Sequence, residues 1–373
     1  MQKELYKNIF ISLYFSLFFA SFYFLNSKLR LAIYAMEGVS LFYFCYTSQF
    51  FKTIFIKKRK AIVATILLLS FFLSMYNNNN ISIVTYCIFF LHFGIVLLLI
   101  TTKIDEICSY IPFLVNILLL SSYYLRNHSF RDVFPEQSHN YVSVYLLLSI
   151  MIIYIAQFQN NLRRNNYLII ILCLLFSILA TGRGGILIFL ILLFFSVIQN
   201  MRHLSKKNYI INLLMLFFIA CGGLLLLLKG LSILGKGFSE RGLDSNGRFI
   251  IWAVYLSNCL TGIKNIIFGV NVLDNIPDVF NHLHNSFLTL YADFGLIGFF
   301  FFIILFIQIG LMFWKKNRNL FLIFLILMFR SFTDLLFPNF AADIFVMYFI
   351  SLLFIEKGYI IYEKEHRYIN SYL

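Results

Sequence analysis

The chain has 373 residues, of which 61% are hydrophobic, 19% aromatic and only 12% charged, and its mean hydropathy is +0.85. This composition excludes a water-soluble globular domain, and the high hydrophobicity excludes a disordered chain. The formal net charge is +14. Long apolar runs separate the basic residues, however, so a nucleic-acid-binding surface is excluded as well. The remaining class is a polytopic helical membrane protein.

A transmembrane helix needs about 20 mostly apolar residues to cross a hydrocarbon core of about 30 Å. Apolar runs of this kind predict an all-α polytopic membrane protein with about 12 transmembrane helices, folded as a single integral membrane domain over residues 1–373. The predicted spans are 8–26, 31–51, 61–76, 81–101, 107–124, 141–157, 167–181, 184–199, 209–228, 285–313, 320–336 and 344–355.

Basic residues set the predicted orientation. Lys and Arg gather in one set of loops, for example at 57–60, 163–164 and 202–207. The positive-inside rule assigns these loops and both termini to the cytoplasm. The first span is predicted to be a retained anchor, because it is long and no small-residue cleavage site follows it. A long outer loop is predicted at 229–283, between helices 9 and 10, so we expect chemistry at the outer membrane face.

The first segment of interest is the Gly182-Arg183-Gly184-Gly185 turn between two apolar runs. The hairpin between the flanking basic residues has about 35 residues, whereas two full crossings need about 40, so its tip is expected below the outer surface. An arginine held there must face protein, water or an anion. The glycines allow a tight turn and close approach of a ligand. The alternative is that Arg183 reaches the lipid headgroups.

The second segment lies in the long outer loop and contains Arg241, Arg248 and Trp252. An apolar stripe at helical spacing predicts an amphipathic helix over about 247–261, lying along the membrane interface. The stripe consists of Phe249, Trp252, Ala253, Leu256 and Leu260. Arg248 falls in its first turn, where free backbone N–H groups and a guanidinium together favour phosphate binding. The alternative is an interfacial helix anchored by Trp252, with Arg248 on a lipid phosphate.

The third segment contains His282, His284 and Asn285 at the outer mouth of a span. A histidine with a pKa near neutrality can act as a base, and a neighbouring polar group can orient it. The His-x-His pair could instead bind a metal, but no further ligands stand at a recognisable spacing. Simple interfacial histidines are the third interpretation.

Four charged residues lie within apolar runs. Arg330 and Asp334 are four residues apart on one predicted helix, so a structural ion pair is expected. Asp293 lies inside its helix, where a carboxylate should be neutral, paired or facing a cavity, and Glu37 raises the same question.

Together the three segments resemble the O-antigen ligase and polymerase superfamily. The resemblance rests on Arg183 in its glycine-bearing turn, on Arg248 four residues before Trp252, and on His-Asn-Ser at 284–286 before Gly-Leu-Ile-Gly at 295–298. It covers about residues 165–345. It implies glycosyl transfer outside the cytoplasmic (inner) membrane, with a polyprenyl-diphosphate-linked oligosaccharide as donor and the lipid diphosphate as leaving group.

By position, the resemblance implies that Arg183 and Arg248 bind the diphosphate and that His284 orients or deprotonates the acceptor hydroxyl. Two fixed guanidiniums can take the place of a metal ion, so neither a metal nor a cofactor is expected. Gly182 departs from the commoner Ser-Arg-Gly form of the turn. Further residues assigned to substrate binding are Arg241, Trp252, His282, Asn285, Asp293 and Arg330.

Within the superfamily, a polymerase of O-antigen or capsule repeat units is preferred, because the chain is short and its outer loops are modest. The alternatives are a ligase that moves the glycan onto lipid A core and a flippase for lipid-linked sugars. The expected partners are the lipid-linked oligosaccharide, the bilayer and a chain-length regulator protein, without nucleic acid. Arg183, Arg248 and His284 are expected to converge on one outward-opening cavity flanked by the amphipathic helix.

Overall fold

The computed structural model describes residues 2–24, 27–46, 83–130, 132–134, 138, 140–162, 166–201, 248–276, 282–338 and 341–353. Within these residues the regular structure is helical and contains no strand. The predicted spans 61–76 and 209–228, the loop residues 229–247 and Arg241 lie outside the described residues.

Every other predicted span overlaps a helix. The helices are α1 (Gln2–Phe24), α2 (Ser27–Tyr46), α5 (Ile83–Thr101), α6 (Glu106–Asn127), α7 (Tyr141–Gln159), α8 (Tyr167–Leu179), α9 (Arg183–Met201), α11 (Arg248–Cys259), α12 (Ile263–Phe268), the short 3-10 helix η1 (Leu273–Asn275), α13 (Ser286–Lys316), α14 (Arg318–Ser331) and a final helix at Asp343–Leu353.

Four helices in the described part of the chain are long and apolar enough to cross a membrane. They are Glu4–Phe24, Glu106–Asn127, Tyr141–Gln159 and Ser286–Lys316. Several apolar helices are shorter. The 13 residues of α8 extend about 20 Å, less than the hydrocarbon core of about 30 Å. The chain is therefore a helical, multi-pass membrane protein, while the count of about 12 spans stays a prediction.

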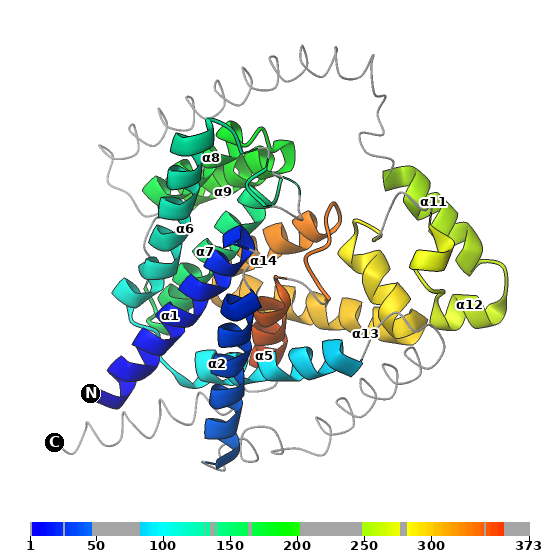
Figure 1. The fold of residues 1–373 in the computed structure, drawn as a ribbon, viewed down its shortest axis with the longest axis horizontal. Helices are drawn as coiled ribbons and strands as arrows, with labels where there is room; N and C mark the ends of the chain where they lie inside the picture. The colour runs from blue at the N-terminus through cyan, green and yellow to red at the C-terminus, as the bar shows by residue number, and fades with distance from the viewer. Residues whose placement is uncertain are drawn as a thin grey trace.

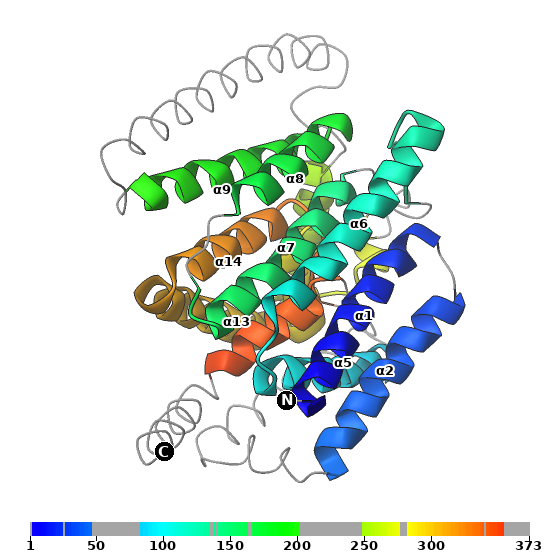
Figure 2. The same cartoon turned by 90° about the vertical axis from the view of Figure 1, so that its left-hand side faces the viewer.

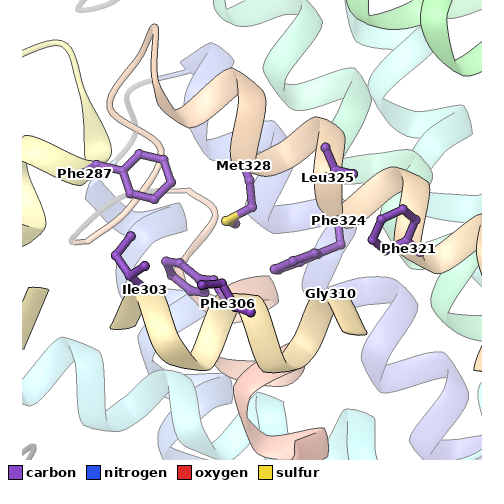
Figure 3. Close-up of a pocket in the computed structure, with 9 residues that line it drawn as sticks. Phe287, Ile303, Phe306, Gly310, Phe321, Phe324, Leu325 and Met328 are labelled. Atoms are coloured by element: carbon purple, nitrogen blue, oxygen red, sulfur yellow. The ribbon is translucent and has the colours of Figure 1, made fainter. Parts of the chain in front are cut away.

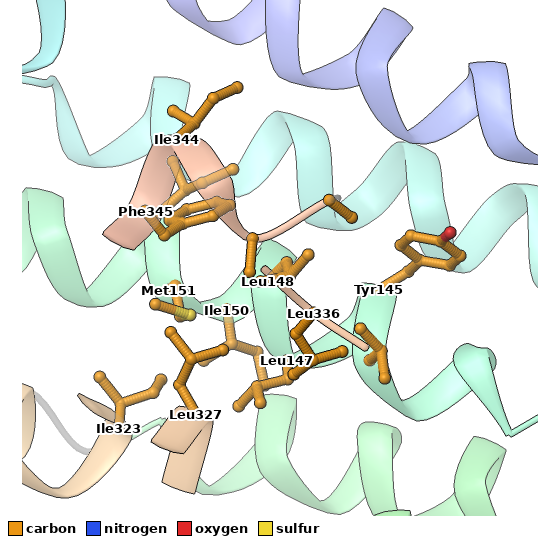
Figure 4. Packing of buried hydrophobic residues seen from close by; sticks show 14 of the residues in the cluster. Tyr145, Leu147, Leu148, Ile150, Met151, Ile323, Leu327, Leu336, Ile344 and Phe345 are labelled. Carbon is orange, nitrogen blue, oxygen red and sulfur yellow. The ribbon is translucent and has the colours of Figure 1, made fainter. Parts of the chain in front are cut away.

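Helix α7 forms the centre of the bundle. In its apolar stretch, 94% of the residues are buried, against 28% to 44% in the other three long helices. A helix that is apolar on all sides is expected in such an interior position. Figure 2 shows α7 between α6 and α14, with the α8–α9 hairpin beside it. In Figure 4, Leu148 and Met151 of α7 lie among buried side chains that include Leu327 and Phe345.

Helix α12 packs on the first half of α13, and α11 lies beside α12, as Figure 1 shows. The Tyr291 hydroxyl donates to the carbonyl oxygens of Asn265 (3.1 Å) and Ile266 (2.8 Å). The Tyr255 hydroxyl donates to the Val270 carbonyl oxygen (3.2 Å). These tyrosines tie α11, α12 and α13 into one unit, which carries two of the three predicted site segments.

The buried face of α11 is not the predicted apolar stripe. Ile251, Tyr255 and Cys259, spaced by four residues, are buried against α12 and α13. The predicted stripe stays largely exposed, because Ile251, Tyr255 and Cys259 form the side of α11 that packs on α12 and α13. Its exposed large members are Phe249, Leu256 and Leu260. An exposed apolar helix face suits a membrane interface, which remains a prediction for this helix.

Gly295 interrupts α13 with a φ of 65°. A Cβ added at this position would lie 2.6 Å from the Ile267 carbonyl oxygen. Only glycine combines a positive φ with such a close backbone approach. The break in α13 therefore allows α12 to dock against it.

We predict that Gly295→Ala lowers the free energy of unfolding by about 2 kcal/mol, because the new methyl group meets the Ile267 carbonyl and φ is positive. Thermal unfolding of the detergent-purified protein measures this. Gly310→Ala on the same helix is the matched control, since its Cβ would make only ordinary contacts at 3.8 and 3.9 Å. Equal unfolding midpoints for the two variants would contradict the prediction.

Candidate active site

The centre of the candidate site is one buried carboxylate that contacts two arginines. Asp334 Oδ2 lies 2.7 Å from Arg330 Nη1, and Asp334 Oδ1 lies 3.4 Å from Arg248 Nη2. The first contact confirms the expected ion pair between residues four apart. The second joins α11 to the segment after α14, across 86 residues of sequence. One carboxylate balances only one guanidinium, so the group retains a positive charge.

The Arg330 guanidinium is fixed by its surroundings. Nη1 donates to Thr333 Oγ1 (3.3 Å), and Nη2 donates to the Asn140 carbonyl oxygen (3.4 Å) at the start of α7. A Cβ added at Gly184 would lie 2.3 Å from Arg330 Nη1. The guanidinium therefore packs directly on the first turn of α9, one residue after Arg183.

In the tight turn before α9, a threonine and not a glycine takes the left-handed conformation. The Gly182 N–H donates to the Ser177 carbonyl oxygen, the Thr181 N–H donates to that of Ile178, and Thr181 takes the left-handed conformation (φ 52°). This pattern is a Schellman motif, in which glycine usually occupies the position of Thr181. The glycines serve another purpose here, because Gly184 and Gly185 allow α9 to pack closely on its neighbours.

Gly185 shows how close this packing is. A Cβ added there would lie 2.2 Å from Ser143 Cβ on α7. Gly182 is less confined, since its nearest atom would be Asn140 Oδ1 at 3.6 Å. The Arg183 side chain is exposed at the first residue of α9. The backbone residue that touches the Arg330 guanidinium is thus Gly184, one position after Arg183.

The histidine segment is held against α11. Trp252 Nε1–H donates to the Leu283 carbonyl oxygen (2.7 Å), between the two histidines. Asn285 Oδ1 accepts the backbone N–H groups of Phe287 (2.9 Å) and Leu288 (3.1 Å) and so caps α13. The polar atoms of Trp252 and Asn285 thus position the loop that carries His284, while the substrate contacts of both residues stay predictions.

His282 and His284 lie side by side. Their ring centroids are 3.7 Å apart, and His282 Nδ1 accepts the backbone N–H of His284 (3.2 Å). Burial lowers the pKa of both histidines, and the positive charge of Arg248 acts in the same direction. His284 has the additional influence of His282, and its pKa falls to about 4. Both rings are therefore neutral at neutral pH.

Ser286 connects this segment with the arginine pair. Its buried hydroxyl donates to the Asp334 carbonyl oxygen (3.1 Å) and accepts the Leu336 N–H (2.8 Å). The start of α13 is thereby fixed to the backbone that follows α14. The hydroxyl makes these contacts across about 50 residues of chain. Ser286 belongs to the His-Asn-Ser segment of the resemblance, but its spacing does not indicate these two partners.

Each of the two arginines has one N–H group without a hydrogen-bond acceptor among the described residues. Arg248 Nε and Arg330 Nε are buried and have no hydrogen-bond acceptor among the described residues. Buried donors in native proteins are nearly always satisfied. An anion with several acceptor oxygens, placed between the two guanidiniums, would satisfy both.

Two acidic residues noted in the sequence lie elsewhere. Asp293 is buried in α13, and its electrostatic neighbour is Asp343 on the final helix. Glu37 is paired with His92 Nδ1 (2.8 Å) and accepts a hydrogen bond from the Tyr14 hydroxyl. The contact of Asp293 with substrate stays a prediction.

The structure thus brings together Arg248, Arg330, His282 and His284. Gly184, the residue after Arg183, packs against the Arg330 guanidinium. The sequence reasoning did not include Asp334, Asn140 or Ser286 among the site residues. Asp334 had a usable signal in its spacing from Arg330, and Ser286 had one in its place in the His-Asn-Ser segment. Among the described residues, no group of three or more His, Cys, Asp or Glu side chains could hold a metal ion.

We predict that Gly184→Ala lowers the free energy of unfolding by about 1–3 kcal/mol, because its methyl group must push the Arg330 guanidinium away from Asp334. The unfolding midpoint in detergent measures the effect. Gly182→Ala is the matched control in the same turn and should be close to neutral. A neutral Gly184→Ala would mean that Arg330 is not held against α9.

An O-antigen ligase family model matches residues 168–303. The matched range includes Arg183, Arg248 and His284 and ends before Arg330 and Asp334. No curated protein and no solved structure matches the chain. The family match confirms the resemblance seen in the three sequence segments. Residues 168–303, about a third of the chain, are therefore similar to the O-antigen ligase family.

Proposed function

We propose that this protein is a membrane glycosyltransferase that takes its glycan from a polyprenyl diphosphate at the outer face of the cytoplasmic membrane. The observation that carries the proposal is the pair of arginines around Asp334, with an unbalanced positive charge and two buried N–H donors that lack an acceptor. A diphosphate supplies both the negative charge and the oxygens that this arrangement calls for.

In the proposed reaction, an acceptor hydroxyl oxygen attacks the anomeric carbon of the donor sugar. The bond from that carbon to the diphosphate oxygen breaks, and polyprenyl diphosphate leaves with the bonding electrons. Arg248 and Arg330, with Arg183 beside them, stabilise the negative charge that develops on the leaving group. His284 accepts the proton of the acceptor hydroxyl.

The low pKa of His284 fits a base whose basicity increases when the glycan donor binds. With a pKa of about 4, the ring is neutral and can accept a hydrogen bond from a hydroxyl, but it is a weak base. A diphosphate bound at Arg248 would offset one of the positive charges that lower this pKa. The pKa of His284 would then rise toward its ordinary value when the donor binds.

Two acceptors are consistent with the site. A second lipid-linked repeat unit would make the protein a polymerase of O-antigen or capsule units, which the short chain and modest loops favour. Lipid A core as acceptor would make it a ligase, which the O-antigen ligase family match favours at least as well. In both cases both termini are in the cytoplasm, and a chain-length regulator is a candidate partner of the polymerase.

The glycan ladder of a deletion strain tests the function. A single repeat unit on lipid A core is expected for a polymerase, and bare core with polymerised glycan kept on the lipid carrier is expected for a ligase. Loss of all external repeat units would instead indicate a flippase and contradict the proposal.

We predict that His284→Asn abolishes long glycan chains while the protein remains in the membrane at normal level. Asparagine tolerates the left-handed backbone at this position (φ 49°), so the substitution removes the imidazole without a new backbone penalty. A complementation assay with the same ladder measures the loss. Normal chain lengths in this variant would remove His284 from catalysis.

We predict that kcat/KM stays constant as the pH falls from 7 to about 5 and drops only near the pKa of the free enzyme's His284, about 4. The neutral ring is the active form, so activity is lost as the pH falls through the pKa. His282→Gln removes one cause of the low pKa and should shift this drop to higher pH. A drop near pH 6.5 in the unmodified enzyme would contradict the assigned environment.

A further inference from the structure

The start of helix α7 contacts the Arg330–Asp334 pair at two places. The Asn140 carbonyl oxygen accepts a hydrogen bond from Arg330 Nη2 (3.4 Å). The Tyr141 hydroxyl donates to the carbonyl oxygen of Leu335 (3.2 Å), the residue that follows Asp334. These contacts join residues 190 and 194 positions apart in the chain. The central helix of the bundle therefore begins directly against the segment that carries the arginine and the carboxylate.

The Tyr141 hydroxyl lies in the field of the charged residues. Asp334, Arg330 and Arg248 all interact electrostatically with it. The side chain is buried, with 7% of the residue exposed, and its ring centroid lies 6.1 Å from that of Tyr145, one turn later on α7. Figure 4 shows Tyr145 beside the buried side chains of the bundle. The ring is thus anchored in the core, and it presents its hydroxyl to the charged group.

Other nearby groups are less suited to binding an anion. The groove between α13 and α14 has only apolar lining side chains, as Figure 3 shows. The Ser286 hydroxyl donates to the Asp334 carbonyl oxygen and accepts the Leu336 N–H. The Thr333 hydroxyl accepts from Arg330 Nη1 and donates to the Arg330 carbonyl oxygen (3.0 Å). Because each of these two hydroxyls both donates and accepts, turning either toward a ligand would break two contacts that hold this segment.

We propose that the Tyr141 hydroxyl is a further binding group for the diphosphate, beside the guanidiniums of Arg248 and Arg330; this inference rests on the proposed function. A bound diphosphate offers the phenol O–H a charged acceptor in place of the neutral Leu335 carbonyl. The contact with that carbonyl, at 3.2 Å, is longer than the usual O–H···O distance of about 2.7–2.8 Å. Hydrogen bonds to charged oxygens are shorter and stronger, so the exchange of acceptors stabilises the bound state.

Binding of glycan-free polyprenyl diphosphate to the purified protein tests the proposal. Tyr141→Phe removes the hydroxyl and keeps the buried ring, and it should weaken binding about tenfold or more. Tyr167→Phe is the matched control, because the Tyr167 hydroxyl also donates to a backbone carbonyl, that of Ser196 (3.1 Å). Tyr167 begins α8, which follows the opposite end of α7 from Tyr141. This control should bind as tightly as the unmodified protein.

A change in the acidity of the phenol tests the contact without removing it. Tyr141→3-fluorotyrosine makes the hydroxyl a stronger hydrogen-bond donor while the ring keeps nearly the same size. Binding of polyprenyl diphosphate should become tighter, because a stronger donor gains more from a charged phosphate oxygen than from the neutral Leu335 carbonyl. The same replacement at Tyr167 should leave the affinity unchanged. An unchanged affinity in Tyr141→3-fluorotyrosine would mean that the phenol keeps the Leu335 carbonyl in both states, which would overturn the proposal.

The pH dependence of kcat/KM separates loss of the hydroxyl from displacement of the arginines. The charge of Arg248 helps to lower the pKa of His284, whereas a neutral phenol adds no such charge. Tyr141→Phe should therefore keep the drop in kcat/KM at about pH 4. A shift of this drop, or an unchanged affinity in folded Tyr141→Phe, would overturn the proposal. Absence of binding in the unmodified protein, or full binding in Arg248→Gln, would count against the proposed function instead.

Discussion

The candidate site depends on the sharing of one buried carboxylate by two arginines that are far apart in the sequence. Asp334 contacts Arg330 within its own segment and Arg248 at the start of α11. Removing one partner of a buried pair leaves an uncompensated charge and commonly costs about 3–5 kcal/mol. Asp334 therefore fixes both the spacing of the two guanidiniums and the position of α11 relative to the central bundle.

The same helix that carries Arg248 also positions the histidines. Trp252 lies one turn after Arg248 and holds the Leu283 carbonyl oxygen between His282 and His284. The arginine proposed to bind the anion and the proposed base are therefore attached to one rigid element. This arrangement explains why the charge of Arg248 reaches His284, and why binding of an anion at Arg248 would alter the basicity of that ring.

Local sequence spacing predicted part of this structure. The apolar runs gave helices close to their observed positions, and the four-residue spacing of Arg330 and Asp334 gave their ion pair. Long-range contacts could not be predicted in this way. The contact between Arg248 and Asp334 joins residues 86 apart, and no local pattern indicates it. The left-handed Thr181 was also unexpected, since glycine normally takes that position and glycines stand directly after it.

Tertiary packing also decided which side of α11 is buried. The sequence offers apolar residues on both sides of this helix, and the docking of Tyr255 and Ile251 on α12 and α13 selects one of them. Likewise, the roles of Gly184 and Gly185 became clear only once Arg330 and Ser143 were seen at the distances where a Cβ would clash.

The most direct test of the account is the affinity of the purified protein for polyprenyl diphosphate without a glycan. The central claim is that the arginines organised by Asp334 bind this diphosphate. Asp334→Asn and Arg248→Gln should each weaken binding about tenfold or more. Asp274→Asn, at an exposed carboxylate in η1, should bind as the unmodified protein does. An unchanged affinity in folded Asp334→Asn and Arg248→Gln proteins would contradict the account.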